Sequence, residues 1–416
     1  MFTLLFLGIP IAVALGLASL SYIALEGLPD VLLIHRMIGG VDSFPLLAIP
    51  FFILAGHLMN SGGITTRIFA LARALVGWAP GGLGHVNIGA SVIFAGMSGA
   101  AVADAGGLGN IEIRAMREAG YDTDFSVGVT AASSTIGPII PPSLPLVIYG
   151  VLASVSIGQL FVAGLIPGLL LALALMVMVA LYARRRGYPR DSRIDFCRIW
   201  VAFKAAFLPL LTPVIIVGGI VSGVFTPTEA AIAAVCYALF LGVFVYRSLG
   251  WRHIVRVSMD TIETSAAVLM IVASATVFAW ILTANQVATL LGDALLGLTE
   301  SPHVLLLLMM AMVLVIGLFM ETIAAITILV PVLLPIAVEV GIDPVHLGIL
   351  LILNLMLGLL TPPVGMVLFV LSDISGVSFE RCVRATVPFL VPLVIVLLLI
   401  VFFPGIALWL PGLLYP

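Results

Sequence analysis

The feature that most constrains the fold is a sequence pattern that occurs twice at a constant spacing. The run GPIIPP at 137–142 returns 221 positions later as GLLTPP at 358–363 (137 to 358). The run AGYD at 119–122 returns at the same spacing as VGID at 340–343. In a membrane chain, a duplication of this kind is typical of a transporter, because two related halves around a midplane site provide two alternating states.

The composition places the chain in a membrane. With 62% hydrophobic and 9% charged residues and a mean hydropathy of +1.30, it is typical of a polytopic helical membrane protein and excludes a soluble globule. The first apolar run, 3–25, lacks a small-residue cleavage site, which predicts a retained helix. Cys197, Cys236 and Cys382 show no metal or disulfide spacing, and no other cofactor is expected.

Apolar segments of spanning length divide the chain. They are predicted at 3–25, 44–60, 124–150, 158–182, 205–226, 229–246, 261–284, 345–372 and 385–403. Two further apolar stretches, 85–118 and 303–338, have polar or Gly-rich centres where a lipid-facing span would be most apolar. Irregular backbone at that depth is tolerated only inside protein or beside a cavity, so both stretches are predicted to be re-entrant hairpins.

The positions of the basic residues test this topology. With residue 1 in the cytoplasm and each hairpin returning to its own side, all of the 17 Lys and Arg residues except Arg36 fall inside. This agrees with the positive-inside rule and places the C-terminus in the periplasm. The run 184–204 is then a cytoplasmic anchor and not a nucleic-acid patch. Segments 27–43, 64–80 and 247–258 are too short or mixed to span and are predicted to lie in the membrane interface.

The predicted fold is an all-α inverted-repeat membrane protein with two re-entrant hairpins and two broken transmembrane helices. The first repeat, 1–183, contains scaffold helices at 1–80, a hairpin and broken helix at 85–150, and a helix at 158–182. A basic linker and connecting helix follow at 184–228. The second repeat, 229–416, contains scaffold helices at 229–284, a hairpin and broken helix at 303–372, and a final helix at 385–403.

The Pro-rich runs interrupt both broken helices, because Pro removes a backbone donor and clashes with the preceding turn. Unwound carbonyl groups together with Ser or Thr hydroxyls suit a small hard cation such as Na⁺, so one sodium site is expected in each repeat. The candidates for the first site are Ser98, Ser134 and the carbonyl groups around Gly137 and Ile140. The candidates for the second site are Gly317, Gly358 and Thr361.

Helix ends beside the breaks and hairpin tips would present free N–H groups to an anion without a buried Lys or Arg. Two acids are predicted inside the membrane. Glu321, in the second tip, could tune the second cation site or titrate during transport, or could instead bond the free amides of its hairpin. Asp104 is expected to be a cap or hairpin brace, and His57 and His85 are expected to be interfacial histidines without a metal.

Several motifs resemble one known family. They are DSFPLLAIPFFILAG at 42–56, FAGMSG at 94–99, AVADA at 101–105 and the run SSTIGPIIPPS at 133–143. The chain resembles the DctM-type large membrane subunit of tripartite ATP-independent periplasmic (TRAP) transporters over essentially its whole length. One departure is the stretch NIEIR at 110–114, which affects the cytoplasmic arm of the first hairpin and not the ion site.

The resemblance implies a sodium-coupled elevator in the bacterial inner membrane. It implies two partners, a small four-helix membrane subunit (DctQ type) and a periplasmic solute-binding protein (DctP type), and a small carboxylate as substrate. The substrate is expected to lie near Ser98, Gly99, Thr135, Thr322 and Thr361.

Two other functions stay open at this stage. A stand-alone sodium/dicarboxylate symporter of similar architecture would not need the partner proteins. An intramembrane protease or lipid transferase is disfavoured, because the chain has no HExxH or GxSxG motif and no paired Ser/His or Asp/Asp within its apolar segments. No P-loop motif indicates ATP hydrolysis.

Overall fold

The computed structural model describes residues 3–4, 7–189, 195–299 and 301–415, and every regular element in these ranges is a helix. Seven helical segments are long and apolar enough to cross a membrane. They are Phe44–Ser61, Ile157–Arg186, Phe196–Val221, Pro227–Val245, Trp251–Ala284, Thr322–Glu339 and Phe379–Phe402. The sequence prediction of an all-helical membrane protein is therefore confirmed.

The first half of the chain begins with short helices and continues into a helix pair and an interrupted helix. In order these are α2 (Ile11–Leu25), α3 (Val31–Val41), η1 (Phe44–Leu47), α4 (Ala48–Ser61), α5 (Ile64–Val76), α6 (Gly82–Ser98), α7 (Ala101–Glu118), α8 (Thr123–Ser134), α9 (Leu144–Ala153) and α10 (Ile157–Arg186). Helices α6 and α7 form a hairpin, and α8 and α9 are the two parts of the first broken helix.

The second half repeats this order. Its helices are α11 (Phe196–Val221), α12 (Pro227–Phe240), η2 (Leu241–Val245), α13 (Trp251–Ala284), α14 (Val287–Leu296), α15 (Pro302–Gly317), α16 (Thr322–Glu339), α17 (Pro344–Leu359), α18 (Met366–Ser375), α19 (Phe379–Phe402) and α20 (Gly405–Leu414). We call α6–α9 the first unit and α15–α18 the second unit. The starts of α7 and α16, and those of α8 and α17, are 221 positions apart (101 to 322; 123 to 344), which matches the sequence repeat.

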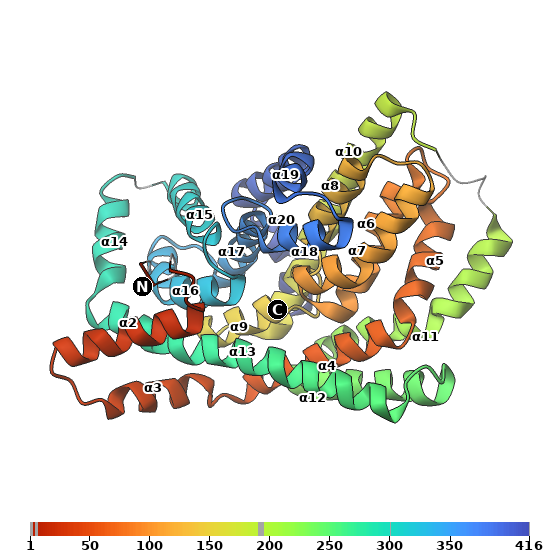
Figure 1. The fold of residues 1–416 in the computed structure, drawn as a ribbon. Coiled ribbons are helices and arrows are strands. Elements are labelled where there is room, and N and C mark those ends of the chain that lie inside the picture. Colours follow the sequence, from red (N-terminus) through yellow and green to blue (C-terminus); the bar gives the residue numbers. More distant parts are fainter. Residues whose placement is uncertain (1–2, 5–6, 190–194, 300, 416) are drawn as a thin grey trace.

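Two layers are visible in the ribbon view. Helices α2, α3, α4, α12 and α13 lie together along one edge of the molecule, and the two units pack above them (Figure 1). We call this edge the scaffold layer. Helix α13 contacts α16 of the second unit, and α4 contacts α6 of the first. Helices of the first unit also contact helices of the second half of the chain: α8 packs against α19, α7 against α18 and α9 against α16.

The broken helices stop where the sequence predicts. Helix α8 ends at Ser134 and α9 begins at Leu144, and residues 135–143 between them are all buried. Helix α17 ends at Leu359 and α18 begins at Met366, and Pro362 and Pro363 between them are exposed. Both Pro-Pro bonds, 141–142 and 362–363, are cis.

Several predicted boundaries are wrong. The predicted span 3–25 is interrupted, because α2 begins only at Ile11, after Pro10. The segment 247–258, predicted to be a separate interfacial helix, is largely continuous with α13. At 34 residues α13 is about 51 Å long, longer than a hydrocarbon core of about 30 Å. The sequence analysis also missed α14 and α20.

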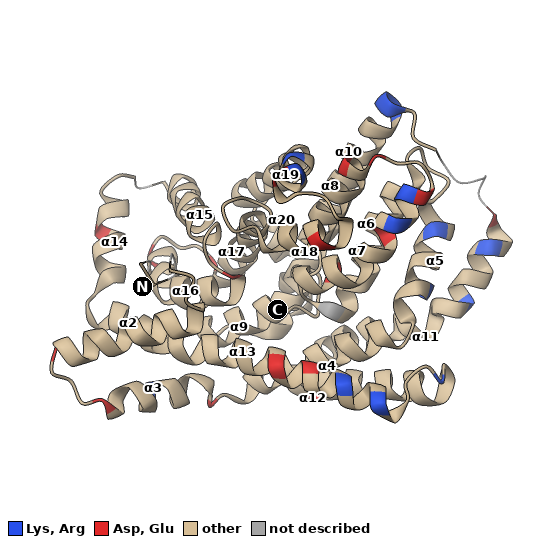
Figure 2. Ribbon diagram, viewed as in Figure 1, with Lys and Arg blue, Asp and Glu red and all other residues tan. Residues whose placement is uncertain are grey.

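The charged residues are distributed unevenly. Lys and Arg gather on α5, α7, α10, α11, the first two turns of α13 and the turn before it, toward the right of the view in Figure 2. The opposite end, around α14 and the loops beside α2 and α3, shows acidic residues in this view (Figure 2). This charge separation runs along the direction of α13.

Candidate functional site

The tip of each hairpin rests on the break of its own unit. In the first unit Gly99 has a φ of +62°, and a Cβ at this position would overlap the Pro142 carbonyl oxygen. Where the same tip meets the break, a Cβ on Gly137 would lie 3.7 Å from the Ala100 carbonyl oxygen. Only glycine combines this positive φ with so close an approach, which explains the glycine at the tip.

The second unit repeats this contact with different residues. A Cβ on Gly358 would lie 2.6 Å from the Gly317 carbonyl oxygen, so the two backbones touch directly. The Val364 N–H donates to the Leu318 carbonyl oxygen at 3.4 Å, which ties the break to the tip. Thr361 lies within the break, and its hydroxyl donates to the Leu357 carbonyl oxygen at 2.7 Å. The three residues predicted for the second cation site therefore share one neighbourhood.

The first predicted cation group is less compact. The Ser134 hydroxyl is buried and donates to the Ala131 carbonyl oxygen at 2.8 Å, next to the start of the break. The Ile140 side chain packs on Gly168 of α10, so only its backbone could contribute to such a site. Ser98 is the last residue of α6, and its side chain lies outside the described part of the structure.

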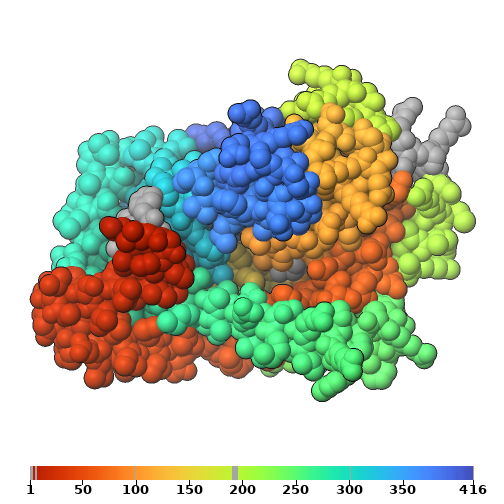
Figure 3. All heavy atoms as spheres, viewed as in Figure 1, coloured from red at the N-terminus to blue at the C-terminus, as the bar shows by residue number. Residues whose placement is uncertain are grey.

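A cavity of about 410 Å³ lies between the two units and the scaffold layer. The first residues of four helices line it: Ala101 of α7, Leu144 of α9, Thr322 of α16 and Met366 of α18. In the space-filling view a hollow is visible between the green edge formed by α13 and the orange and blue units above it (Figure 3). Each helix N-terminus carries a partial positive charge, so four of them at one cavity favour an anion there, although side chains already cap α9 and α16.

The scaffold layer supplies the remaining wall of the cavity. His57 and Asn60 of α4 and Thr264 of α13 are its polar residues. His57, which the sequence analysis placed at the membrane interface, thus faces the cavity. Among the described residues, the lining contains one acid, Glu321, and no Lys or Arg.

The structure gives Glu321 a specific role in the second tip. Its Oε2 accepts hydrogen bonds from the Ile323 N–H at 2.8 Å and the Ala324 N–H at 3.3 Å, so it caps α16. The sequence left open whether Glu321 tunes a cation site or bonds the free amides of its hairpin. The observed contacts are of the second kind. Asp104 does not cap α7: it lies in the first turn, and its carboxylate accepts no cap hydrogen bond. It lies beside Ser91 of α6, the other arm of the hairpin, so a role as hairpin brace stays a prediction.

Of the residues predicted to bind substrate, Thr322 lines the cavity. Gly99 packs against the first break, as described above. The Thr135 hydroxyl is buried and donates to the Ala132 carbonyl oxygen at 2.6 Å. Thr361 lies in the second break. The sequence analysis placed His57 at the membrane interface and did not single out Asn60, so it predicted neither of these two cavity residues.

Residues 1–406 match the sequence model of the family described as "Tripartite ATP-independent periplasmic transporter, DctM component". The chain belongs to this family. The sialic acid TRAP transporter large permease protein SiaM of Vibrio cholerae is 51% identical over 99% of this chain and 96% of that protein. The C4-dicarboxylate TRAP transporter large permease protein DctM of Pseudomonas aeruginosa is 40% identical over 89% of this chain and 87% of that protein.

A solved structure is similar in fold. The YdaH transporter of Alcanivorax borkumensis aligns with a TM-score of 0.64 at 17% identity, covering 91% of this chain and 88% of that one. At this identity the likeness concerns the fold alone. Together with its apolar helices, membership of the TRAP family makes the chain a multi-pass transporter subunit of the inner membrane and not an enzyme. The family also implies a small permease and a periplasmic binding protein as partners.

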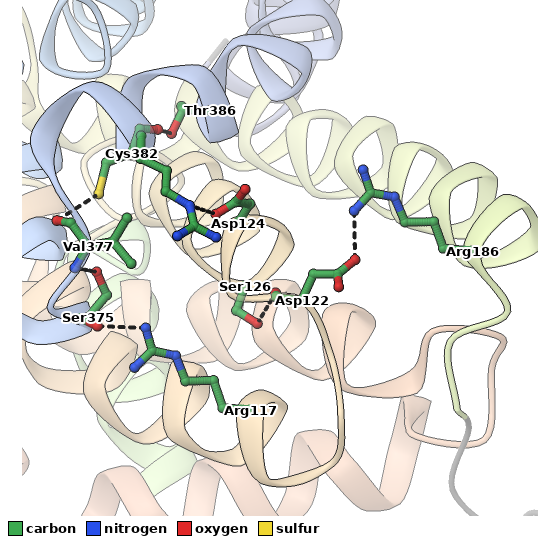
Figure 4. Close-up of polar contacts among 10 residues, drawn as sticks. Arg117, Asp122, Asp124, Ser126, Arg186, Ser375, Val377, Cys382 and Thr386 are labelled. Carbon is green, nitrogen blue, oxygen red and sulfur yellow. Dashed lines mark hydrogen bonds and ion pairs between the residues drawn. The ribbon is translucent and has the colours of Figure 1, made fainter.

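Polar contacts join the two halves of this TRAP subunit at the ends of α8 and α19 (Figure 4). Arg381 Nε lies 2.7 Å from Asp124 Oδ1, and Arg117 donates to the Ser375 carbonyl oxygen at 2.6 Å. Nearby, Arg186 lies 2.7 Å from Asp122 Oδ2. Hydrogen bonds from the Tyr188 hydroxyl and from Arg186 hold the pKa of Asp122 below its usual range. These exposed pairs fix the geometry of the ends and contribute little stability each.

Proposed function

We propose that the chain is the large subunit of a sodium-coupled TRAP importer that carries a small carboxylate by an elevator movement. The cavity carries this proposal, because four helix N-termini converge there without a Lys or Arg in its described lining. A carboxylate bound among free N–H groups and helix dipoles is stabilised without a buried cationic side chain. The two relatives named above are permeases for sialic acid and C4-dicarboxylates, which are both organic acids.

Sodium would bind where each hairpin tip meets its break. The first site would use Ser98, Ser134, Gly137 and the Ile140 carbonyl, and the second would use Gly317, Gly358 and Thr361. Support comes from the close backbone contacts at Gly99–Pro142 and Gly317–Gly358, and from the Ser134 and Thr361 hydroxyl groups at the two breaks. A cation at each break would also offset the charge of a bound carboxylate nearby.

In this movement the two units would shift together relative to the scaffold layer. We propose that the hairpins and broken helices at 85–150 and 303–372 move together against the scaffold helices at 1–80 and 229–284, with the two repeats inverted. The end rich in Lys and Arg would face the cytoplasm, with the N-terminus inside and the C-terminus in the periplasm. The cavity lies between the moving part and the fixed part, which is where alternating access requires it.

Vesicle uptake tests this function. The chain would be reconstituted with its small subunit, and the binding protein would be supplied outside with radiolabelled sialic acid or succinate. We expect uptake that needs an inward sodium gradient and the binding protein, with a potassium gradient as the matched control. Uptake of free substrate by the large chain alone would instead identify a stand-alone symporter. Sodium-independent uptake would overturn the coupling.

A further inference from the structure

A column of buried polar side chains lies between α6, α7 and α8. The Asn87 amide on α6 donates to Glu112 Oε2 on α7 and to Thr130 Oγ1 on α8, each at 2.7 Å. The Ser133 hydroxyl donates to Asn87 Oδ1 at 2.6 Å. None of the four side chains is more than 1% exposed. Glu112 Oε2 is therefore held by the Asn87 amide, which Thr130 and Ser133 hold in turn.

Other carboxyl oxygens in this column have no partner. Glu112 Oε1 and both oxygens of Asp104 form no hydrogen bond among the described residues, and Asp104 is also 1% exposed. Asp104 lies two turns nearer the start of α7, with Ser91 of α6 beside it. Two ionised carboxylates buried in one helix bundle are costly unless a positive charge accompanies them.

The neighbouring helices show which groups could supply that charge. Helices α5, α6, α8 and α18 pack against α7. Their titratable or charged residues are Arg67 and Arg73 of α5, His85 of α6, Asp124 of α8 and Asp373 of α18, with Asp122 at the start of α8. Arg67 binds the Gly63 carbonyl oxygen and lies on the Tyr246 ring, and Asp122 and Asp124 pair with Arg186 and Arg381. Among the described residues, the hydrogen-bond partner of Glu112 is the neutral amide of Asn87.

We propose that Glu112 is a proton-binding site of the first unit, with the proton on Oε1. Asp104 lies in the first turn of α7, where the positive end of the helix favours a carboxylate. Glu112 lies in a later turn, without that support. Asn87 turns its amide donors toward Glu112, whereas a metal ion would need oxygen ligands there.

This site would couple proton movement to transport. Helices α6–α8 belong to the part that we propose to move, so a proton on Glu112 would travel with them. That last step rests on the proposed function, whereas the bound proton does not. The two are separable, because a bound proton can be detected in the purified chain without any uptake.

Infrared difference spectroscopy of the purified full chain in lipid nanodiscs tests the site. At neutral pH in a choline buffer we expect a carbonyl stretching band of a protonated carboxyl group. The band should be lost in Glu112→Gln and kept in Glu118→Gln, whose acid is exposed and paired with Arg114 on the same helix. Because Glu112→Gln could disturb folding, Glu112→Asp is measured too, and it should shift the band.

Three results would overturn the proposal. The first is a band that disappears in Asp104→Asn but stays in Glu112→Gln. The second is loss of the band when sodium replaces choline at constant pH, which would make this a sodium site. The third is a band that stays unshifted in Glu112→Asp. If the band is retained in sodium and lost in Glu112→Gln, the result supports a proton bound at Glu112.

Discussion

The two units share one backbone plan but close their breaks in different ways. In the first unit the break is fully buried, and the Ser143 hydroxyl closes it by donating to the Pro138 carbonyl oxygen. In the second unit the matching position is Val364, whose backbone N–H reaches across to the hairpin instead, and the neighbouring prolines are exposed. Both breaks touch their own hairpin tips, but the first is closed by a hydrogen bond within the break, whereas the second is tied to its hairpin by one.

The units also differ in the position of their acids. The first hairpin has Ala100 at the cap of α7 and places its acids inside the helix bundle, at Asp104 and Glu112. The second hairpin has Glu321 at the matching cap position, beside the cavity. A repeated backbone with different side chains allows the two units to bind different ions. Four substitutions or pairs of substitutions test this difference.

The largest effect is expected where the second hairpin touches its break. Gly358→Val would place its side chain 2.6 Å from the Gly317 carbonyl oxygen, so one of the two backbones would have to move. We expect uptake to fall at least tenfold and the stability to drop by about 1–3 kcal/mol, as for other overpacked positions. Thermal unfolding and vesicle uptake measure the two effects.

Gly412→Val is the matched control, because a Cβ at Gly412 meets nothing within 4 Å. It should leave uptake close to that of the unsubstituted chain. Normal uptake by Gly358→Val would show that the second hairpin moves away from its break more easily than the backbone contact indicates.

The hydroxyl groups of the two proposed sodium sites should contribute to sodium affinity. Thr361→Ala removes a half-buried hydroxyl, and Ser134→Ala removes a fully buried one. We expect each to weaken the apparent sodium affinity of uptake about tenfold, or about 1.4 kcal/mol, with little loss of folding for Thr361→Ala. Uptake measured against sodium concentration checks this. An unchanged sodium affinity in Thr361→Ala would count against the second site.

A smaller effect is expected at the cap of α16. Glu321→Ala removes the acceptor of two backbone N–H groups and should lower stability by about 0.5–2 kcal/mol, the usual cost of losing such a cap. Ala100→Gly, at the matching position of the first unit, removes no cap and is the control. Equal stability loss in both variants, measured by thermal unfolding, would contradict the difference between the two tips.

The sequence predicted the breaks and hairpins well, because Pro and Gly act on the backbone locally. The two runs, GPIIPP and GLLTPP, directly predict where α8 and α17 end and where α9 and α18 begin. It could not predict the polar column, because Asn87, Glu112 and Thr130 belong to three helices whose packing only the fold determines. The same holds for His57, which reaches the cavity because α4 packs beside α13.

The boundaries that failed have a common physical cause. The junction near 251–260 is charged enough to resemble an interfacial segment, but its helical hydrogen bonds continue into α13 regardless of where a membrane would end. Helices α14 and α20, each of 10 residues, are too short to be recognised as spans. Hydropathy therefore finds the membrane-crossing segments but not the lengths of the helices that contain them.

The smallest difference concerns one matched pair of acids, Asp122 and Asp343, at the caps of α8 and α17 (122 to 343). Asp343 Oδ1 accepts the Val345 N–H at 2.7 Å and the His346 N–H at 3.3 Å, so it is a true cap. Asp122 makes no side-chain cap bond in the structure and instead pairs with Arg186 and Tyr188. Asp343→Ala should cost about 1 kcal/mol, and Asp122→Ala at most a few tenths because its ion pair is exposed.

The pH dependence separates the Asp122 contribution from that of a cap. Its pKa is lowered in the folded chain, first by the Tyr188 hydroxyl and then by Arg186. A lowered pKa means that the ionised form is stabilised by folding, so the contribution is complete above the ordinary Asp pKa of about 3.9 and is lost as the pH falls below it. The stability difference between the unsubstituted chain and Asp122→Asn should therefore shrink as the pH falls through the lowered pKa of Asp122, and also in high salt at pH 7. A difference that changes with neither acid nor salt would show that Asp122 acts through the helix end and not through its charge.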